Sequence, residues 1–132
     1  MKKIILAFCI FSANHVMAQA STASKQSAIR GKLVYQQVCL SCHQADGGGV
    51  PNMNPPLIKS TWVAGDKKKL INIVLKGFEE KVAINGSYFS NNMPAQNSLT
   101  DQQIADVLTY IRSNFGNKAS AIAPKDVTAQ RK

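Results

Sequence analysis

The stretch Cys39-Leu40-Ser41-Cys42-His43 has the pattern C-x-x-C-H. Two thiols lie three positions apart, and an imidazole follows the second thiol directly. Thiols at this spacing can each form a thioether bond to one vinyl group of a haem, and the histidine can then place its ring on the iron. The pattern therefore predicts one covalently attached haem c held by Cys39, Cys42 and His43.

Other chemistries of paired cysteines fit this chain less well. A structural zinc ion needs four ligands, whereas only three Cys or His residues remain once the N-terminal segment described below is removed. A thioredoxin-type redox pair normally lies beside βαβ structure, which the sequence pattern does not predict. A simple disulfide would leave His43 without a role. Haem attachment is therefore the favoured interpretation.

Residues 1–18 have the layout of a secretory signal peptide. Lys2 and Lys3 precede an apolar run from Ile4 to Ala13, and the small residues Ala18 and Ala20 allow cleavage after either one. The run is shorter than the roughly 20 residues that cross a bilayer. We expect export to the periplasm and no membrane insertion, with an uncleaved anchor as the alternative.

Cleavage after Ala18 would change both the length and the charge of the chain. It removes 18 of the 132 residues and two of the 16 basic residues, which leaves 114 residues with 14 basic and 7 acidic side chains, a net charge of +7. This length suits one domain with a modest core, and the basic charge favours encounters with acidic surfaces. Export and the lack of aromatic residues interleaved with the basic ones argue against nucleic-acid binding.

The periodicity predicts an all-α domain at residues 27–116, with a flexible lead-in at 19–26 and a basic C-terminal tail at 117–132. The tail has room for a short helix after Pro124. A small β-hairpin is expected around Asn85-Gly86. Three main helices are predicted: Ser27–Val38, Lys67–Lys76 and Asp101–Phe115. Their apolar faces are thin for a core of this size, so a haem is expected to fill the middle.

Local signals place the helix ends. Ser27 is a plausible first cap, Asp66 and Gly77 bound the second helix, and Thr100 with Gln103 forms a capping box for the third. The run Lys67–Lys69 is expected to face water.

The sixth position of the iron decides what the haem can do. No second histidine remains after signal removal, and methionine is the ligand of electron-transfer haems with raised potential. Of the two remaining methionines, Met53 lies only ten residues after His43, in a loop expected on the histidine side. Met93, beside the stiffening Pro94, is the better candidate, so His43 and Met93 are the expected metal ligands. The alternative is that Met93 is merely part of the core.

The histidine also needs an acceptor for its second ring nitrogen. A rigid loop at Pro55 and Pro56 could aim a backbone carbonyl at it. These prolines could instead do no more than shape the turn.

From about Gly31 to Phe115 the chain resembles class I (mitochondrial-type) monohaem cytochrome c of the short bacterial periplasmic type. Gly31-x-x-x-Tyr35-x-x-x-Cys39 is similar to the N-terminal helix of that family, and residues 106–111 are similar to its partner helix. The resemblance implies the class I cytochrome c fold around one haem, with a small hairpin before the axial methionine loop.

Further segments carry the same resemblance. Pro55-x-Leu57 implies that the Pro55 carbonyl supports His43 and that Leu57 packs on the haem. Met93-Pro94, followed by Leu99-Thr100-Asp101, resembles the axial-methionine loop. Trp62 matches an aromatic residue that often touches a haem propionate, although a plain core position fits it equally well.

These observations favour a monomeric electron carrier over an enzyme, because two protein ligands on the iron leave no position for a substrate. The expected partners are redox proteins with acidic docking surfaces: a dehydrogenase, a nitrite reductase or a terminal oxidase. An electron-entry subunit held permanently by a larger dehydrogenase or reductase is the second possibility. A peroxidase or gas sensor is the third, and it requires Met93 to be off the iron.

Overall fold

The computed structural model describes residue 19 and residues 21–81, 83–84 and 86–131. The predicted signal peptide, its cleavage sites at Ala18 and Ala20, and Asn85 lie outside the described residues. Among the residues that are described, no helix is both long enough and apolar enough to cross a membrane.

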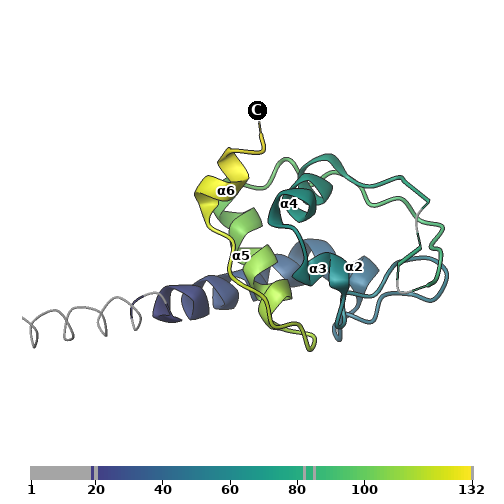
Figure 1. The fold of residues 1–132 in the computed structure, drawn as a ribbon, viewed down its shortest axis with the longest axis horizontal. Coiled ribbons are helices and arrows are strands. Elements are labelled where there is room, and N and C mark those ends of the chain that lie inside the picture. Colours follow the sequence, from purple (N-terminus) through teal and green to yellow (C-terminus); the bar gives the residue numbers. More distant parts are fainter. Residues whose placement is uncertain (1–18, 20, 82, 85, 132) are drawn as a thin grey trace, which may run out of the picture.

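The described chain is mostly helical, as predicted. A helical segment at residues 21–34 comes first (Figure 1). The elements that follow are η1 (Tyr35–Cys39), α2 (Leu40–His43), α3 (Thr61–Ala64), α4 (Lys67–Lys76), α5 (Asp101–Ser113) and α6 (Pro124–Thr128).

The first helical segment starts earlier and ends later than the sequence pattern suggests. Residues 21–26, expected as a flexible lead-in, are helical, and helix continues through the π-helical turn η1 into α2. Ser27 therefore lies inside the helix and is not its cap; its hydroxyl donates to the Asp106 carboxylate. The helix projects from the body of the molecule at its N-terminal end (Figure 1).

This N-terminal helix crosses α5 at Gly31. A Cβ atom at Gly31 would lie 1.9 Å from the carbonyl oxygen of Asp106, so only glycine permits the approach. Beside this crossing the rings of Tyr35 and Tyr110 lie 5.5 Å apart, and Tyr35 is buried. The contact between these two helices is as the resemblance implied.

Helices α4 and α5 have the predicted caps. At the start of α4 the Asp66 side chain accepts a hydrogen bond from the Lys69 N–H. At its end the Gly77 N–H donates to the Ile73 carbonyl. A capping box of Thr100 and Gln103 begins α5. The core of the domain combines the buried faces of these helices with residues of the N-terminal helix and the C-terminal segment, and it includes Tyr35, Ile71, Ile104, Leu108 and Val127.

The C-terminal segment belongs to the packed domain. Ile122 and Val127 are 3% and 0% exposed, and the side chain of Asp101 in α5 accepts hydrogen bonds from Thr128 and Arg131. The predicted short helix after Pro124 is present as α6, which lies beside α5 in Figure 1.

Two long loops complete the domain, one between α2 and α3 and one between α4 and α5. They meet where the Ser90 N–H donates to the Asn52 carbonyl and the Asn91 N–H donates to the Met53 carbonyl. In place of the predicted hairpin, the described residues of 81–89 contain one isolated bridge between Ile84 and Ser87. The bridge marks a turn between Ile84 and Ser87, but no paired strands extend from it among the described residues.

Candidate functional site

A cavity lies between the helical body and the two long loops. Cys39, Cys42 and His43 line one part of its wall, and Met93 lines another. The space between the walls is about 1370 Å³, including solvent at the mouth. The chain thus brings together residues separated by about fifty positions, all of which the sequence analysis singled out.

The π-helical turn η1 leads into the attachment motif. It ends at Cys39, and α2 then carries Cys42 and His43. Gln44 follows with a φ of 62°, which ends the helix and turns the chain away. The Tyr35 hydroxyl donates to the Gln44 carbonyl at 2.6 Å, which ties the turn back to the helix. Such π-turns are often found at functional sites, and the sequence pattern did not predict this one.

The imidazole of His43 has a backbone partner. Its Nδ1 atom lies 3.1 Å from the carbonyl oxygen of Pro55, the acceptor that the sequence analysis named. Burial lowers the pKa of His43, and the bond to Pro55 opposes that shift. A neutral ring that donates from Nδ1 keeps its Nε2 lone pair free to bind a metal ion.

Glycines 47 and 49 let the loop fold back to bring Pro55 under the ring. Gly49 has a φ of 70°, its N–H donates to the His43 carbonyl, and a Cβ atom there would lie 2.3 Å from the Asn54 carbonyl oxygen. Gly47 has a φ of 74° and accepts from the Leu57 N–H at 2.7 Å. The glycine-rich stretch is therefore a tight turn that places the Pro55 carbonyl beside the His43 ring.

The two thiols of the motif are not joined in a disulfide. Burial raises the pKa of the Cys39 thiol to about 11, and the neighbouring Cys42 adds to the rise. Cys42 is exposed. Both thiols line the cavity wall, so both face the space where a cofactor would be attached.

Met93 is half-buried against the core and lines the cavity. Its backbone forms an isolated antiparallel bridge with Phe78, just after α4. Met53, by contrast, is 46% exposed and is not part of the cavity wall. Of these two methionines, Met93 is the one on the described cavity wall.

Leu57 and Trp62 both line the cavity. The Trp62 ring packs edge-on against Phe78 with 5.5 Å between centroids, and the Lys69 ammonium lies 3.8 Å from the Trp62 ring centroid. Trp62 is half-buried, so it lies at the rim of the core and not inside it. Of the run Lys67–Lys69, predicted to face water, Lys68 and Lys69 are exposed and Lys67 is half-buried. The Lys67 ammonium donates to the Ala121 carbonyl.

Sequence reasoning missed several apolar residues of the wall. They come from the α3 to α5 region and from the second loop: Val74, Phe78, Phe89, Val107, Leu108 and Ile111. The helix faces of α4 and α5 were predicted to be buried around a haem, but the sequence did not indicate which of their residues border the cavity. Phe78 had one signal, its place directly after the helix stop at Gly77.

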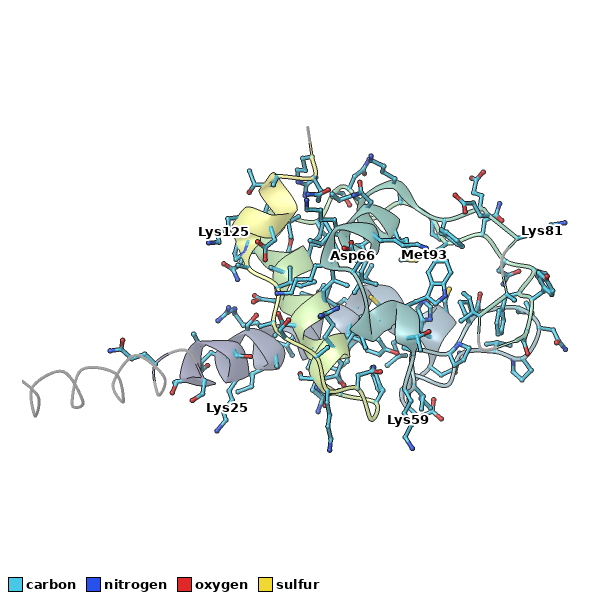
Figure 2. All side chains as sticks on the ribbon, in the orientation of Figure 1. Lys25, Lys59, Asp66, Lys81, Met93 and Lys125 are labelled. Carbon is cyan, nitrogen blue, oxygen red and sulfur yellow. The ribbon has the colours of Figure 1, made fainter. Side chains whose placement is uncertain are left out.

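The charged side chains on the described cavity wall are Glu79, Glu80 and Lys81. The basic residues are spread over the molecule: Figure 2 shows Lys25, Lys59, Lys81 and Lys125 on different sides of it. Among the described residues, Lys81 is the lysine on the cavity wall.

The donor set and the wall fit a covalent haem. Two thiols, one imidazole with a free Nε2 and one thioether line a largely apolar cavity, and soft sulfur with imidazole is a ligand pair that suits haem iron. Faces of α4 and α5 form part of this wall, in line with the expectation that a haem fills the space between the helices.

A family model described as Cytochrome c matches residues 28–115. The alcohol dehydrogenase (quinone) cytochrome c subunit of Gluconacetobacter polyoxogenes is 36% identical over 123 residues, which is 91% of this chain and 25% of that protein. The gluconate 2-dehydrogenase cytochrome c subunit of Pantoea cypripedii is 38% identical over 106 residues, 77% of this chain and 24% of that protein.

A cytochrome c-552 of Thermus thermophilus is 28% identical over 134 residues, 98% of this chain and 83% of that protein. The chain therefore spans about a quarter of the length of the two dehydrogenase subunits and most of the length of this smaller relative.

Proposed function

Because the chain belongs to the cytochrome c family, we propose that it is a periplasmic protein that carries one covalent haem c and transfers one electron at a time between redox partners. The cytochrome c-552 of similar length supports a small independent carrier. When bound, the haem supplies the one-electron chemistry, since its iron is stable in two oxidation states. The residues of the chain attach it, orient it and limit access to it.

The observation that carries this proposal is the placement of His43 and Met93 on the wall of one cavity. His43 would occupy the fifth position of the iron, with its ring held by the Pro55 carbonyl. Met93 would occupy the sixth. Cys39 and Cys42 would form the thioether bonds, which fix the haem against α2.

Two protein ligands would close the iron to substrates, so the proposed role is that of a carrier without catalytic activity of its own. Electrons would then pass through the part of the haem nearest the cavity mouth. Leu57 would pack on the haem face, and Trp62 would lie at its edge beside Lys69.

The net charge of +7 expected after cleavage at Ala18, from 14 basic and 7 acidic residues, supports encounters with acidic partner surfaces. The protein would bind them as a monomer, in a weak and salt-sensitive complex. The local charge is mixed, because Glu79 and Glu80 lie on the cavity wall with Lys81. The position of the docking face would therefore depend on the distribution of charge over the whole molecule.

The second candidate is a permanent electron-entry subunit or module of a dehydrogenase. Its support is the similarity to proteins named as cytochrome c subunits of alcohol and gluconate dehydrogenases. Co-purification with a large partner in high salt would favour this candidate, whereas release of the free protein at moderate salt would favour the shuttle.

The absorption spectrum of the ferric protein tests the ligand set, because methionine-ligated ferric haem has a weak far-red band. We expect the wild type and Met53→Ala to show the band and Met93→Ala to lack it. Met53 is the matched control because it is exposed and lies outside the cavity wall. Absence of the band in the wild type would favour an open sixth position, as in a peroxidase or gas sensor, and its survival in Met93→Ala would refute the ligand assignment.

A further inference from the structure

The end of α4 and the segment from Met93 to Gln96 are joined by backbone hydrogen bonds. The Phe78 N–H donates to the Met93 carbonyl at 2.9 Å, and the Met93 N–H donates to the Phe78 carbonyl at 2.9 Å. Three residues on, the Gln96 N–H donates to the Val74 carbonyl at 2.8 Å. The methionine segment is thus attached to the last turn of α4 at two points.

Between these two points lies Gly77, with a φ of 80°. A Cβ atom at this position would lie 2.6 Å from the Met93 carbonyl oxygen and 3.0 Å from the Ala95 nitrogen. Both are backbone atoms of the methionine segment, so a side chain at 77 cannot be accommodated by a rotamer change. The segment would have to move away from α4.

Helix α4, which carries this contact, is held in place by its packing and its hydrogen bonds. The buried face of α4 packs in the core, and its last N–H bond runs from Gly77 to the Ile73 carbonyl at 2.9 Å. A methionine side chain has three rotatable bonds and adapts easily. A fixed position for its sulfur therefore has to come from a fixed backbone, as site geometry generally does.

We propose that Gly77 and Phe78 are positioning residues for the sulfur of Met93: the close approach at Gly77 and the two bonds of Phe78 hold the Met93 backbone at the distance from α4 at which its side chain reaches the haem iron. This inference rests on the proposed role of Met93 as sixth ligand. It assigns to a helix-ending glycine a second role beyond its usual conformational one.

A side chain at position 77 would push the Met93 carbonyl outward and strain both bonds to Phe78. The methionine would then compete less well for the iron. The apparent affinity of an added ligand would rise in proportion to the fraction of molecules in which Met93 is off the iron. The predicted signature is a loss of methionine ligation in a protein that still contains its haem and still folds.

The test compares Gly77→Ala with Gly86→Ala. Gly86 has a φ of 79°, nearly the same as Gly77, but among the described residues nothing beyond its chain neighbours lies within 4 Å of its would-be Cβ. Both variants therefore place a side chain at a positive φ, and only the one at position 77 meets the Met93 segment. We expect Gly77→Ala to lose most of the far-red band and to bind imidazole about tenfold more tightly or better, and Gly86→Ala to match the wild type in both.

A second pair, Gly77→Asn and Gly86→Asn, repeats the comparison with another side chain. Gly77 has φ 80° and ψ −177°, a region of backbone conformation that is essentially restricted to glycine, so asparagine does not relieve the strain there. The Cβ contact is unchanged, so the loss of the band should persist in Gly77→Asn. Far-ultraviolet circular dichroism and the haem content per chain would establish that each variant is folded and loaded.

The outcomes separate this inference from the proposed function. If the wild type has the band and Met93→Ala lacks it, but both Gly77 variants keep it with unchanged imidazole affinity, the positioning role is wrong while the ligand assignment holds. If neither Gly77 variant folds although both Gly86 variants do, Gly77 serves the fold and the inference is again wrong. A wild type without the band refutes the ligand assignment on which the inference rests.

Discussion

The Nδ1 atom of His43 lies 3.1 Å from the carbonyl oxygen of Pro55, and Gly49 lies against both residues. The Gly49 N–H donates to the His43 carbonyl at 3.1 Å, and a Cβ atom on Gly49 would lie 2.8 Å from the Pro55 oxygen. The ring, its acceptor and the glycine that lets them meet form one unit. A hydrogen bond of this kind makes a metal-bound imidazole more basic.

Replacing Gly49 with alanine should displace the Pro55 carbonyl and weaken its bond to His43. A less basic imidazole stabilises the ferric iron less, so the reduction potential should rise. About 1 kcal/mol of hydrogen-bond energy corresponds to roughly 40 mV for a one-electron couple, so we expect a rise of about 20–60 mV. Redox titration of the purified protein measures it.

The control for this experiment is Gly48→Ala. The nearest atom to a Cβ at Gly48 is Oδ1 of the Asp46 side chain, at 3.0 Å, and that side chain can move. Equal potentials for Gly49→Ala and Gly48→Ala would show that the glycine does not govern the histidine.

The second prediction concerns the crossing of the N-terminal helix and α5. Gly31→Ala places a methyl group 1.9 Å from the Asp106 carbonyl oxygen, and the helices must separate to admit it. Overpacking of this kind lowers the free energy of unfolding by about 1–3 kcal/mol, although alanine is the better helix former by about 1 kcal/mol. Denaturant unfolding measures the change.

The control is Lys32→Ala, at the next position, which is exposed. Its free energy of unfolding should stay within about 0.5 kcal/mol of the wild type. A Gly31→Ala variant more stable than the wild type would contradict the packing described here.

The third prediction concerns Arg112, which is 3% exposed. Its guanidinium donates to the carbonyls of Val63, Gly65 and Ser120, and burial lowers its pKa. Arg112→Met should cost about 2–3 kcal/mol of unfolding free energy, since it leaves these acceptors without their donor.

Arg112→Lys is the informative companion variant. Lysine keeps the charge but lacks the planar fork that reaches several acceptors at once, so we expect it to remain clearly less stable than the wild type. Lys118→Met, at an exposed position, is the control for loss of a basic residue. Full stability in Arg112→Lys would mean that charge alone matters at this position.

The fourth prediction concerns pH and the C-terminal segment. Hydrogen bonds from Thr128 and then Arg131 lower the pKa of the Asp101 carboxyl below its ordinary value of 3.8. A carboxyl with a lowered pKa adds stability above its ordinary pKa and loses it as the pH falls through the folded value. Hydrogen exchange of residues 122–131, corrected for the intrinsic rate, should therefore speed up below about pH 4.

Asp101→Asn should remove the acid-dependent part of this effect, because its side chain does not titrate. The variant should exchange faster than the wild type at neutral pH and show a smaller change on acidification. An identical acid profile in the two proteins would assign the pH dependence to another group.

Several elements could be predicted from the sequence because their signals are local. The ends of α4 follow from Asp66 and Gly77, and the start of α5 follows from Thr100 and Gln103. The hairpin is not confirmed: its described residues form one bridge, between Ile84 and Ser87, and a turn signal at Gly86 does not by itself provide partners for flanking strands. The start of the first helix was also wrong, because Ser27 resembles a cap while its hydroxyl donates to Asp106, 79 residues away.

The chemistry proposed for this protein came from the sequence by itself: the C-x-x-C-H motif, the count of histidines after the expected cleavage and the preference for Met93 over Met53 depend only on residue identity and spacing. Only the tertiary structure decided which backbone atoms those residues meet. The approaches of Gly77 to Met93 and of Gly31 to Asp106 join segments that are distant in the chain, whereas the approach of Gly49 to Pro55 lies within one tight turn. The contacts between distant segments result from the packing of the whole domain, and no local pattern of residues encodes them.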